Sequence, residues 1–317
     1  MDKILNKIYS EINNHKKIII HRHKRPDLDS IGSQMALYEY IKLNFPGKEV
    51  YAGTYDNYTG YEFIGEHTVI TGNMYHNALV LVVDTANAER IDARFDMKST
   101  NVIKIDHHPN ETPYGNVMYV EEERSSTCEV LFYMFKHWNE VNDFKFSREI
   151  CYPLFCGIYG DTGGFKFQNT KADTFAALSE IMQYDIPFED TVLRLQAYEE
   201  DIVRLVGYAY QNIEIEDKVG YIIFDKQFQE EHNTTPAKLS NVVNFLGTFE
   251  NLRAWVVFNE YDNFIRVNLR SKGAIDISKI AMQYNGGGHK NASGAMIYEW
   301  HETKDVVDKL KKITSEE

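Results

Sequence analysis

The sequence predicts an α/β protein with a parallel-sheet N-terminal domain, a helical linker and a smaller α+β C-terminal domain. Its 317 residues suit two domains, since a domain commonly has ~100–200 residues. In the first two thirds of the chain, short apolar runs alternate with amphipathic stretches, as in repeated β–α units. Beyond a long helical stretch, strands joined by short turns become frequent. We therefore place the domains at residues 1–188 and 214–317, with the linker at 189–213.

The elements of the N-terminal domain follow from the period of the apolar residues. Continuous apolar runs predict buried strands, and apolar residues three and four positions apart predict helices. The predicted strands are 16–23, 78–85 and 101–108, and the predicted helices are 30–45, 126–138, 146–159 and 171–184. Each strand ends in polar residues. Because functional side chains gather at the carboxyl ends of parallel strands, we expect the site at that edge of the sheet.

The linker and the C-terminal domain have a different pattern. The linker carries charges on one face of a long helix, with leucines and valines elsewhere. In the C-terminal domain the predicted strands are 220–225, 253–260, 264–271 and 294–298, and the predicted helices are 276–284 and a final one from about Thr303. This mixture without β–α repetition indicates an α+β domain.

The chain is acidic, with 34 basic and 47 acidic side chains and a net charge of −13. Affinity for long duplex nucleic acid comes mainly from cations that neutralise phosphates, so this balance argues against a broad duplex-binding surface. A small phosphorylated ligand needs only a local cluster of cations or a bound metal. The composition is therefore compatible with short nucleotide partners.

The cysteines and the hydropathy pattern indicate a cytoplasmic protein that does not bind membranes. Cys128, Cys151 and Cys156 are odd in number and form no CxxC pair, which argues against a disulfide framework or structural zinc. The N-terminal stretch is polar and amphipathic, unlike a signal peptide. The longest apolar run, at residues 79–83, is far too short to span a bilayer.

Four segments combine carboxylates and imidazoles at strand ends or in glycine-rich turns. They are 23–33, 83–85, 106–109 and 157–165. One aspartate at a strand end commonly caps the following helix. These segments hold five, which are Asp27, Asp29, Asp84, Asp106 and Asp161. Five carboxylates in one crevice repel strongly unless cations lie between them. Mixed His and Asp ligands favour first-row divalent ions over calcium, and a pair of such ions suits phosphoryl chemistry.

The order and spacing of these residues resemble the four signature motifs of the DHH phosphoesterase superfamily. The motifs are H-x-x-P-D-x-D-x-x-G-S at 23–33, a strand-end Asp at 84, D-H-H at 106–108 and G-D-T-G-G-F at 160–165. The run NGGGHKNASG at 285–294 resembles the glycine-rich phosphate loop of the superfamily's associated C-terminal domain, and Arg270-Ser271 matches the Arg-Ser that accompanies it. The likeness extends from about residue 16 to 298 and is most similar to the standalone nanoRNase/pAp-phosphatase branch.

The resemblance implies a site for two manganese ions with six protein ligands. They are His23, Asp27, Asp29, Asp84, His107 and Asp161. His23 and Asp27 would hold the first ion, and Asp84 would bridge it to the second. Two residues depart from the family pattern, since Leu28 stands where Gly is common and Ser30 follows the second aspartate. Both departures leave the ligands intact.

The resemblance assigns roles to two further residues of the third motif. Asp106 would orient a ligand and fix its tautomer. His108 would face the substrate phosphate as a hydrogen-bond donor or general acid. His21 is an additional imidazole at the end of the first strand, and we interpret it as lying near the site rather than taking part in it.

The C-terminal domain is expected to bind the substrate phosphate. The residues assigned to this role are Arg270, Ser271, Gly287, Gly288 and His289. Glycine lets backbone N–H groups approach an anion closely because no Cβ intervenes, and Arg270 can bind a phosphate through two parallel hydrogen bonds. With metals on one wall of an interdomain cleft and this clamp on the other, short substrates would fit better than long polymers.

The resemblance thus implies a two-metal phosphohydrolase whose partners are short RNA oligonucleotides and small phosphorylated nucleotides. It would degrade very short oligoribonucleotides to 5′-mononucleotides and dephosphorylate 3′,5′-bisphosphorylated adenosine (pAp) to AMP. A phosphodiesterase of c-di-AMP or pApA is the alternative with the same architecture, and a non-catalytic nucleotide-binding sensor is the alternative from another class. The sequence leaves open whether the chain forms a homodimer.

Overall fold

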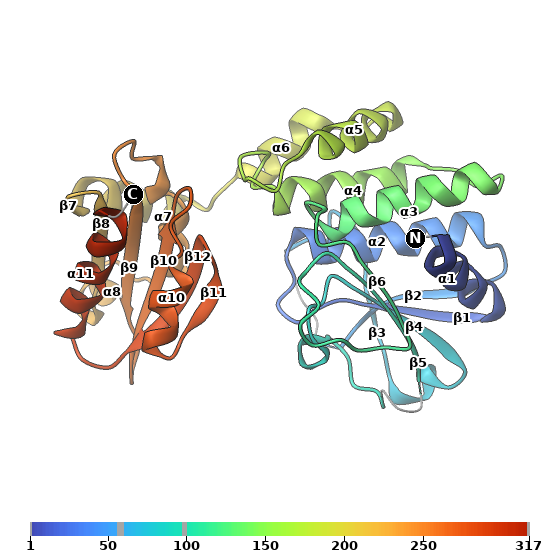
Figure 1. The fold of residues 1–317 in the computed structure, drawn as a ribbon, viewed down its shortest axis with the longest axis horizontal. Coiled ribbons are helices and arrows are strands. Elements are labelled where there is room, and N and C mark those ends of the chain that lie inside the picture. Colours follow the sequence, from blue (N-terminus) through green and yellow to red (C-terminus); the bar gives the residue numbers. More distant parts are fainter. Residues whose placement is uncertain (1, 56–59, 97–99, 316–317) are drawn as a thin grey trace. The chain divides into compact units, whose positions relative to one another are not determined.

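Runs of β-branched residues form the centre of the N-terminal unit, a six-stranded parallel sheet in the order β3-β2-β1-β4-β5-β6 (Figure 1). The strands are β1 (Lys17–His21), β2 (Glu49–Thr54), β3 (Thr68–Val69), β4 (Ala78–Val83), β5 (Asn101–Asp106) and β6 (Val117–Val120). This computed structural model describes residues 2–55, 60–96 and 100–315. The chain divides into two units, Met1–Leu193 and Arg194–Glu317.

Helices α2, α3 and α4 lie on one face of the parallel sheet (Figure 1). The helices of this unit are α1 (Asp2–Asn14), α2 (Leu28–Asn44), α3 (Thr127–Val141), α4 (Arg148–Asp161), α5 (Ala172–Ile181) and, at the boundary, α6 (Phe188–Gln196), with short 3₁₀ turns η1 (Gly72–Tyr75), η2 (Ala88–Arg90) and η3 (Met182–Tyr184). An apolar cluster contains Ile19, Val80 and Val82 of the strands together with residues of the loops and of η1.

Two glycines allow α2, α3 and α4 to pack closely against one another. A Cβ at Gly32 would lie 2.5 Å from the carbonyl oxygen of Pro153, and one at Gly157 would lie 2.2 Å from Sγ of Cys128. Both distances are well below van der Waals contact, so a side chain at either position forces its neighbours to move. Because Asp29 lies one turn before Gly32 on α2, this packing also determines where the Asp29 carboxylate lies.

The predicted α/β class and the parallel N-terminal sheet are confirmed. The three predicted strands of this domain are β1, β4 and β5. Strands β2, β3 and β6 were not predicted, because β3 and β6 are short edge strands and β2 lies next to an edge. Such strands are only partly buried, and their sequences lack the continuous apolar run of a central parallel strand.

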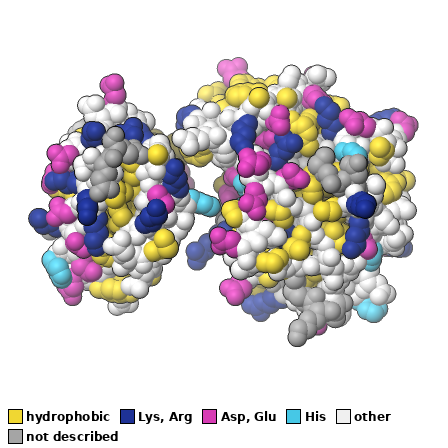
Figure 2. Space-filling view, viewed as in Figure 1, with side chains coloured by type: hydrophobic (Ala, Val, Ile, Leu, Met, Phe, Trp, Pro, Cys, Tyr) yellow, Lys and Arg dark blue, Asp and Glu magenta, His cyan; other side chains and the backbone are white. Residues whose placement is uncertain are grey.

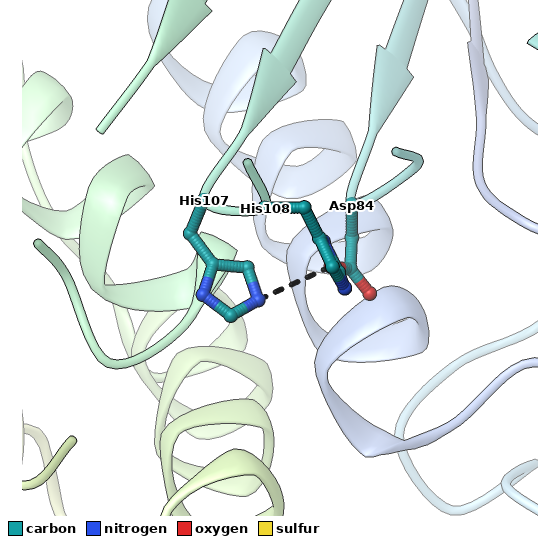
Figure 3. A group of neighbouring side chains, drawn as sticks. All are labelled: Asp84, His107 and His108. Carbon is teal, nitrogen blue, oxygen red and sulfur yellow. Dashed lines mark ion pairs between the residues drawn. The ribbon is translucent and has the colours of Figure 1, made fainter. Parts of the chain in front are cut away.

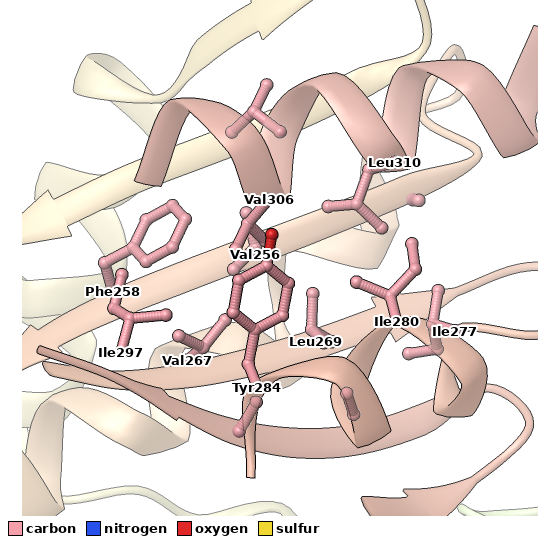
Figure 4. Close-up of a cluster of buried hydrophobic side chains, with 14 of the residues drawn as sticks. Val256, Phe258, Val267, Leu269, Ile277, Ile280, Tyr284, Ile297, Val306 and Leu310 are labelled. Carbon is pink, nitrogen blue, oxygen red and sulfur yellow. The ribbon is translucent and has the colours of Figure 1, made fainter. Parts of the chain in front are cut away.

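A mixed six-stranded sheet in the order β11-β12-β10-β9-β8-β7 forms the C-terminal unit. Its strands are β7 (Glu214–Glu216), β8 (Val219–Phe224), β9 (Ala254–Glu260), β10 (Ile265–Ser271), β11 (Gly287–His289) and β12 (Ala292–Ile297). Its helices are α7 (Glu200–Asn212), α8 (Lys226–Glu231), α9 (Pro236–Ser240), α10 (Ser278–Ala281) and α11 (Glu302–Ser315), with 3₁₀ turns η4 (Asn241–Asn244), η5 (Leu246–Thr248) and η6 (Met282–Tyr284). One apolar core, around Val256, Phe258 and Leu310, lies between the sheet and α10 and α11 (Figure 4). Residues of α7, α8 and α9 form a second core with alternate residues of β8 and β9.

The stretch predicted as a linker, 189–213, differs from a single connecting helix. It contains α6 from its second residue onward and the whole of α7, separated by a short break. Ile202, Leu205 and Val206 of α7 are buried in the core that α7 forms with β8 and β9. Apolar residues at this spacing form a helix face that packs on a sheet, so α7 belongs to the C-terminal unit.

The cysteines behave as their number suggests. Cys128, Cys151 and Cys156 are buried and free. Burial raises the pKa of Cys151 and Cys156 to about 12, so these thiols stay protonated and unreactive at neutral pH. Among the described helices, none is long and apolar enough to cross a membrane.

We expect Gly32→Ala to lower the free energy of unfolding by about 1–3 kcal/mol, the usual effect of overpacking a dense interior. Urea unfolding followed by circular dichroism measures this change. Gly72→Ala is the matched control, because a Cβ at Gly72 would meet nothing within 4 Å. Equal stability of the two variants would contradict the close packing of α2 on α4.

Candidate metal centre

Acidic and imidazole side chains gather beyond the carboxyl ends of β1, β4 and β5. Asp84 follows β4 directly, and His107 and His108 follow β5, with all three side chains close together (Figure 3). Asp29 from the first turn of α2 and Asp161 from the end of α4 reach the same region. The structure therefore brings the four predicted motifs to one edge of the sheet, as expected for a parallel α/β fold.

The first potential metal group consists of His23, Asp27 and Asp84. Nε2 of His23 lies 3.4 Å from Oδ2 of Asp27 and 3.4 Å from Oδ2 of Asp84. Nδ1 of His23 is 2.9 Å from the carbonyl oxygen of Lys24. A carbonyl only accepts hydrogen bonds, so Nδ1 carries the proton and Nε2 is left as the ligand atom.

The second potential metal group consists of Asp29, His107 and Asp161. Nε2 of His107 lies 3.2 Å from Oδ2 of Asp161 and 4.0 Å from Oδ2 of Asp29. It is also 3.7 Å from Oδ1 of Asp84, the contact that is dashed in Figure 3. Asp84 therefore presents one oxygen to each group, which is the arrangement expected of a bridging carboxylate.

The residues of both groups fit a pair of divalent cations. Ligand atoms that share one ion at ~2.1 Å and at right angles are roughly 3 Å apart, close to most of the separations seen here. Nε2 of His107 is buried and, apart from its ion pairs with the neighbouring aspartates, makes no hydrogen bond to the described residues. A buried polar atom normally has a partner, so an ion at this position would satisfy it. The mixture of imidazole and carboxylate suits manganese, iron or another first-row ion.

Without a cation, the cluster holds protons in unusual places. Burial lowers the pKa of His23, but the carboxylates of Asp27 and Asp84 outweigh it and raise that pKa to about 10. Burial also opposes the charge on His107, yet the surrounding aspartates raise its pKa to about 10. Burial and the neighbouring Asp84 raise the pKa of Asp29 far above its usual range. These pKa shifts show that the carboxylates of the cluster favour bound protons or other positive charge among them.

The local sequence explains how Asp27 is held. Asp27 is the N-cap of α2, where its side chain accepts a hydrogen bond from the backbone N–H of Ser30 at 3.0 Å. In return, Oγ of Ser30 accepts from the backbone N–H of Asp27 at 3.0 Å. This reciprocal capping box gives Ser30, which departs from the family pattern, a role in orienting a ligand.

Helix α3 supplies contacts that the sequence analysis missed. The backbone N–H groups of Thr127 and Cys128 donate to the two carboxylate oxygens of Asp29 at 2.7 and 2.9 Å. Oγ1 of Thr127 lies 3.2 Å from Oδ1 of Asp84. The free N–H groups and the dipole of a helix N-terminus stabilise an anion. The N-cap Ser126 was the available signal, because it marks where those free N–H groups begin.

Asp84 has an unusual backbone conformation. Its φ is +48°, in the left-handed region that costs an L-residue roughly 1–2 kcal/mol. Such strain persists only where the surrounding contacts enforce it, and it is commonest at functional sites. The direction of the Asp84 carboxylate therefore depends on the contacts that hold the turn after β4.

Asp106 contacts His108 directly. Oδ1 of Asp106 accepts from the backbone N–H groups of His107 and His108 at 2.8 and 3.2 Å, and from Nδ1 of His108 at 2.9 Å. Burial opposes the charge of Asp106, but His108 and Lys104 lower its pKa below the usual value. Asp106 is thus an ionised carboxylate that orients the His108 ring.

His21 belongs to none of the His and Asp groups found among the described residues. Its Nε2 is 2.9 Å from the hydroxyl of Tyr75, and its ring stacks on Tyr75 and Phe95. Burial lowers the pKa of His21 to about 4. A neutral ring packed against two aromatic side chains is a core residue, in agreement with its interpretation as a neighbour of the site.

In the C-terminal unit, the structure brings Arg270 and His289 to one face of the sheet. Ala292 on β12 pairs with Arg270 on β10 and with His289 on β11. Directly paired residues point to the same side of a sheet, so Arg270 and His289 flank a small side chain on that side. Gly288 has φ +140° and a Cβ there would meet the backbone of β12, so the glycine run forms a tight β-hairpin rather than a plain loop.

Ser271 lies on the other face of that sheet, because successive residues of a strand alternate. It is 8% exposed. Its hydroxyl donates to the carbonyl oxygen of Ile275 and accepts from the Asn291 side chain. Gly287 pairs with Gly294 on β12, and a Cβ at Gly287 would meet nothing within 4 Å. The geometry therefore leaves Ser271 in a structural role and Gly287 accessible.

Comparison with known proteins agrees with these features. The family profile "DHH family, N-terminal domain" matches residues 17–158, and "DHHA1 domain" matches residues 216–316. The "Bifunctional oligoribonuclease and PAP phosphatase NrnA" of Bacillus subtilis is 38% identical over 303 residues, covering 94% of this chain and 95% of the relative. The "Probable bifunctional oligoribonuclease and PAP phosphatase NrnA" of Streptococcus mutans is 37% identical over 309 residues, covering 96% of this chain and 97% of the relative. An exopolyphosphatase-related protein from Bacteroides fragilis shares the fold, with a TM-score of 0.86 at 23% identity over 100% of this chain and 96% of that one.

We expect the protein to bind two Mn²⁺ ions per chain and Asp84→Asn to weaken both sites. The loss should exceed the roughly 10- to 100-fold that follows removal of an outer-sphere partner, because each site loses a charged ligand. Isothermal titration calorimetry measures both affinities. Glu111→Gln, the same change of charge at an exposed position, should have no effect. Wild-type affinity at both sites in Asp84→Asn would refute the bridging geometry.

We also expect Mn²⁺ binding at pH 7 to release protons. The metal-free pKa values of His23 and His107, both about 10, mean that both rings are protonated below that pH and must lose a proton to bind an ion. Roughly two protons per chain should be released, and the affinity should rise with pH. Titrations in two buffers of different ionisation enthalpy count the protons, and a count of zero would contradict these protonation states.

Proposed function

The chain belongs to the DHH family, and from this membership we propose that it is a phosphohydrolase of very short oligoribonucleotides and of pAp. Its products would be 5′-mononucleotides from the oligonucleotides and AMP from pAp. The names of the Bacillus subtilis and Streptococcus mutans relatives, which align over nearly the full chain, support this choice. The observation that carries it is the pair of His and Asp groups, with Asp84 in the first group and its other oxygen 3.7 Å from His107 of the second.

We propose that two manganese ions occupy these groups. His23, Asp27 and Asp84 would hold one ion, and the second group would hold the other. When bound, such a pair activates water and neutralises charge that develops on a phosphoryl group. Asp27 and Asp161 are partly exposed, whereas Asp29 and Asp84 are buried. The exposed side of the cluster is therefore where a phosphate would enter.

His108 is the proposed proton donor to the leaving oxygen. Its Nδ1 donates to Asp106 at 2.9 Å, so Nε2 is the atom left to face a substrate. Burial lowers the pKa of His108, but Asp106 outweighs this effect and the pKa is raised. A ring that is protonated near neutral pH can give its proton to the departing oxygen.

The face of the C-terminal sheet that carries Arg270 and His289 is the proposed binding surface for a substrate phosphate. Burial lowers the pKa of Arg270, although an arginine stays charged at any physiological pH. Its guanidinium contacts the side chain of Asn244 at 3.0 Å, which orients it. On the visible surface, basic side chains are interspersed with acidic ones (Figure 2), which supports short substrates over long duplexes.

A turnover assay with added Mn²⁺ tests this function. We expect phosphate release from pAp and mononucleotide release from di- to pentaribonucleotides, with c-di-AMP and pApA as comparison substrates. His108→Asn should lower kcat by about 10²- to 10⁴-fold, the usual contribution of a general acid. Arg270→Ala should mainly raise KM. Arg204 is an exposed arginine paired with Glu200, so Arg204→Ala should change neither kcat nor KM.

Other outcomes of this assay identify the alternatives. Turnover confined to c-di-AMP and pApA would make the protein a diadenylate phosphodiesterase. Binding of pAp without any product release would make it a nucleotide sensor. Either result would overturn the proposed function, although the intact set of six metal residues argues against the sensor.

A further inference from the structure

Lys104 is a fully buried cation beneath the metal centre. It lies on β5 two residues before Asp106, so both side chains point to the same face of the sheet. Its Nζ is 2.9 Å from the carbonyl oxygen of Ala86, 3.1 Å from Oδ1 of Asn110 and 3.2 Å from Oδ2 of Asp106. An ammonium has three N–H donors, and here it makes two hydrogen bonds and an ion pair with the Asp106 carboxylate. These contacts explain how a lysine can be 0% exposed.

The three acceptors belong to the segments that carry the catalytic cluster. Ala86 lies in the turn after β4, two residues beyond Asp84. Asn110 lies in the loop after β5, two residues beyond His108. Asp106 is the carboxylate that orients the His108 ring. One ammonium therefore joins the Asp84 turn, the loop that holds both histidines and the partner of His108.

The left-handed backbone of Asp84 needs such support. Tyr114 donates its hydroxyl to the carbonyl oxygen of Thr85 at 2.8 Å, and Lys104 donates to the next carbonyl along the chain, that of Ala86. The Lys104 ammonium also lies 4.9 Å from the centre of the Tyr114 ring. The two carbonyls that follow Asp84 are thus both held by buried donors, which maintains the strained turn.

We propose that Lys104, supported by Tyr114, is a positioning residue that holds Asp84 and the Asp106–His108 pair in the geometry needed for metal binding and proton transfer. This inference rests on the proposed function. It adds to the metal ligands a buried lysine that contacts neither group of ligands and acts through backbone carbonyls and through Asp106.

The test is the variant Lys104→Met, which keeps an unbranched side chain only one atom shorter and removes its charge and its donors. We expect Mn²⁺ affinity and kcat each to fall about 10- to 100-fold, as for other outer-sphere partners of metal sites, with KM unchanged. Removing a positive charge would by itself strengthen cation binding. A fall in Mn²⁺ affinity in calorimetry therefore reports lost positioning and not altered electrostatics.

The matched control is Lys48→Met. Lys48 also joins carbonyl oxygens of two residues, Asn13 and His15, but it does so at the amino ends of β1 and β2. The Lys48→Met variant should be less stable than the wild-type protein but should keep its Mn²⁺ affinity and kcat. If Lys104→Met fails to fold, Tyr114→Phe decides the question, because it removes only the hydrogen bond to Thr85 and should weaken Mn²⁺ binding about 2- to 10-fold.

Two results would overturn the inference. Wild-type Mn²⁺ affinity and kcat in folded Lys104→Met, or wild-type affinity in Tyr114→Phe when Lys104→Met does not fold, would show that these contacts do not position the cluster. A wild-type protein that binds Mn²⁺ and turns over substrate would then leave the proposed function standing. A wild-type protein that binds no Mn²⁺ would overturn both.

Discussion

Mutual repulsion among aspartates at one sheet edge is the constraint on which the N-terminal unit depends. Asp29 and Asp84 are buried side by side, and burial together with this neighbour raises the pKa of Asp29. Like charges so close in a partly dry site are unfavourable unless positive charge lies between them. Protonated histidines supply that charge in the metal-free chain, and divalent cations are the proposed occupants in the working enzyme.

Much of the surrounding structure serves to hold those carboxylates against their repulsion. The N-terminus of α3 donates two N–H groups to Asp29, and the capping box of α2 fixes Asp27. The close approach of α2 and α4 at Gly32 and Gly157 places the helix that carries Asp29. These supports come from α2, α3 and α4, so the geometry of the cluster depends on how the three helices pack.

In the C-terminal unit, strand pairing alone positions the side chains of interest. Strand pairing sets Arg270 and His289 on either side of Ala292, and strand alternation turns Ser271 into the core. The proposed phosphate site needs only a hairpin of the correct register, because directly paired residues share a face. This accounts for the glycine at position 288, where the hairpin backbone is left-handed in φ and closely packed.

The sequence by itself determined the strands β1, β4 and β5, the edge at which the site lies and the residue types that gather there, because apolar period and motif spacing are local properties. Only the tertiary structure decided that α7 packs in the C-terminal unit, that Ser271 faces inward and that Thr127, Cys128 and Lys104 support the ligands. Each of these depends on partners distant in the sequence. A hydrogen bond between Thr127 and Asp29 spans 98 positions, and no local pattern encodes which segments a fold brings together.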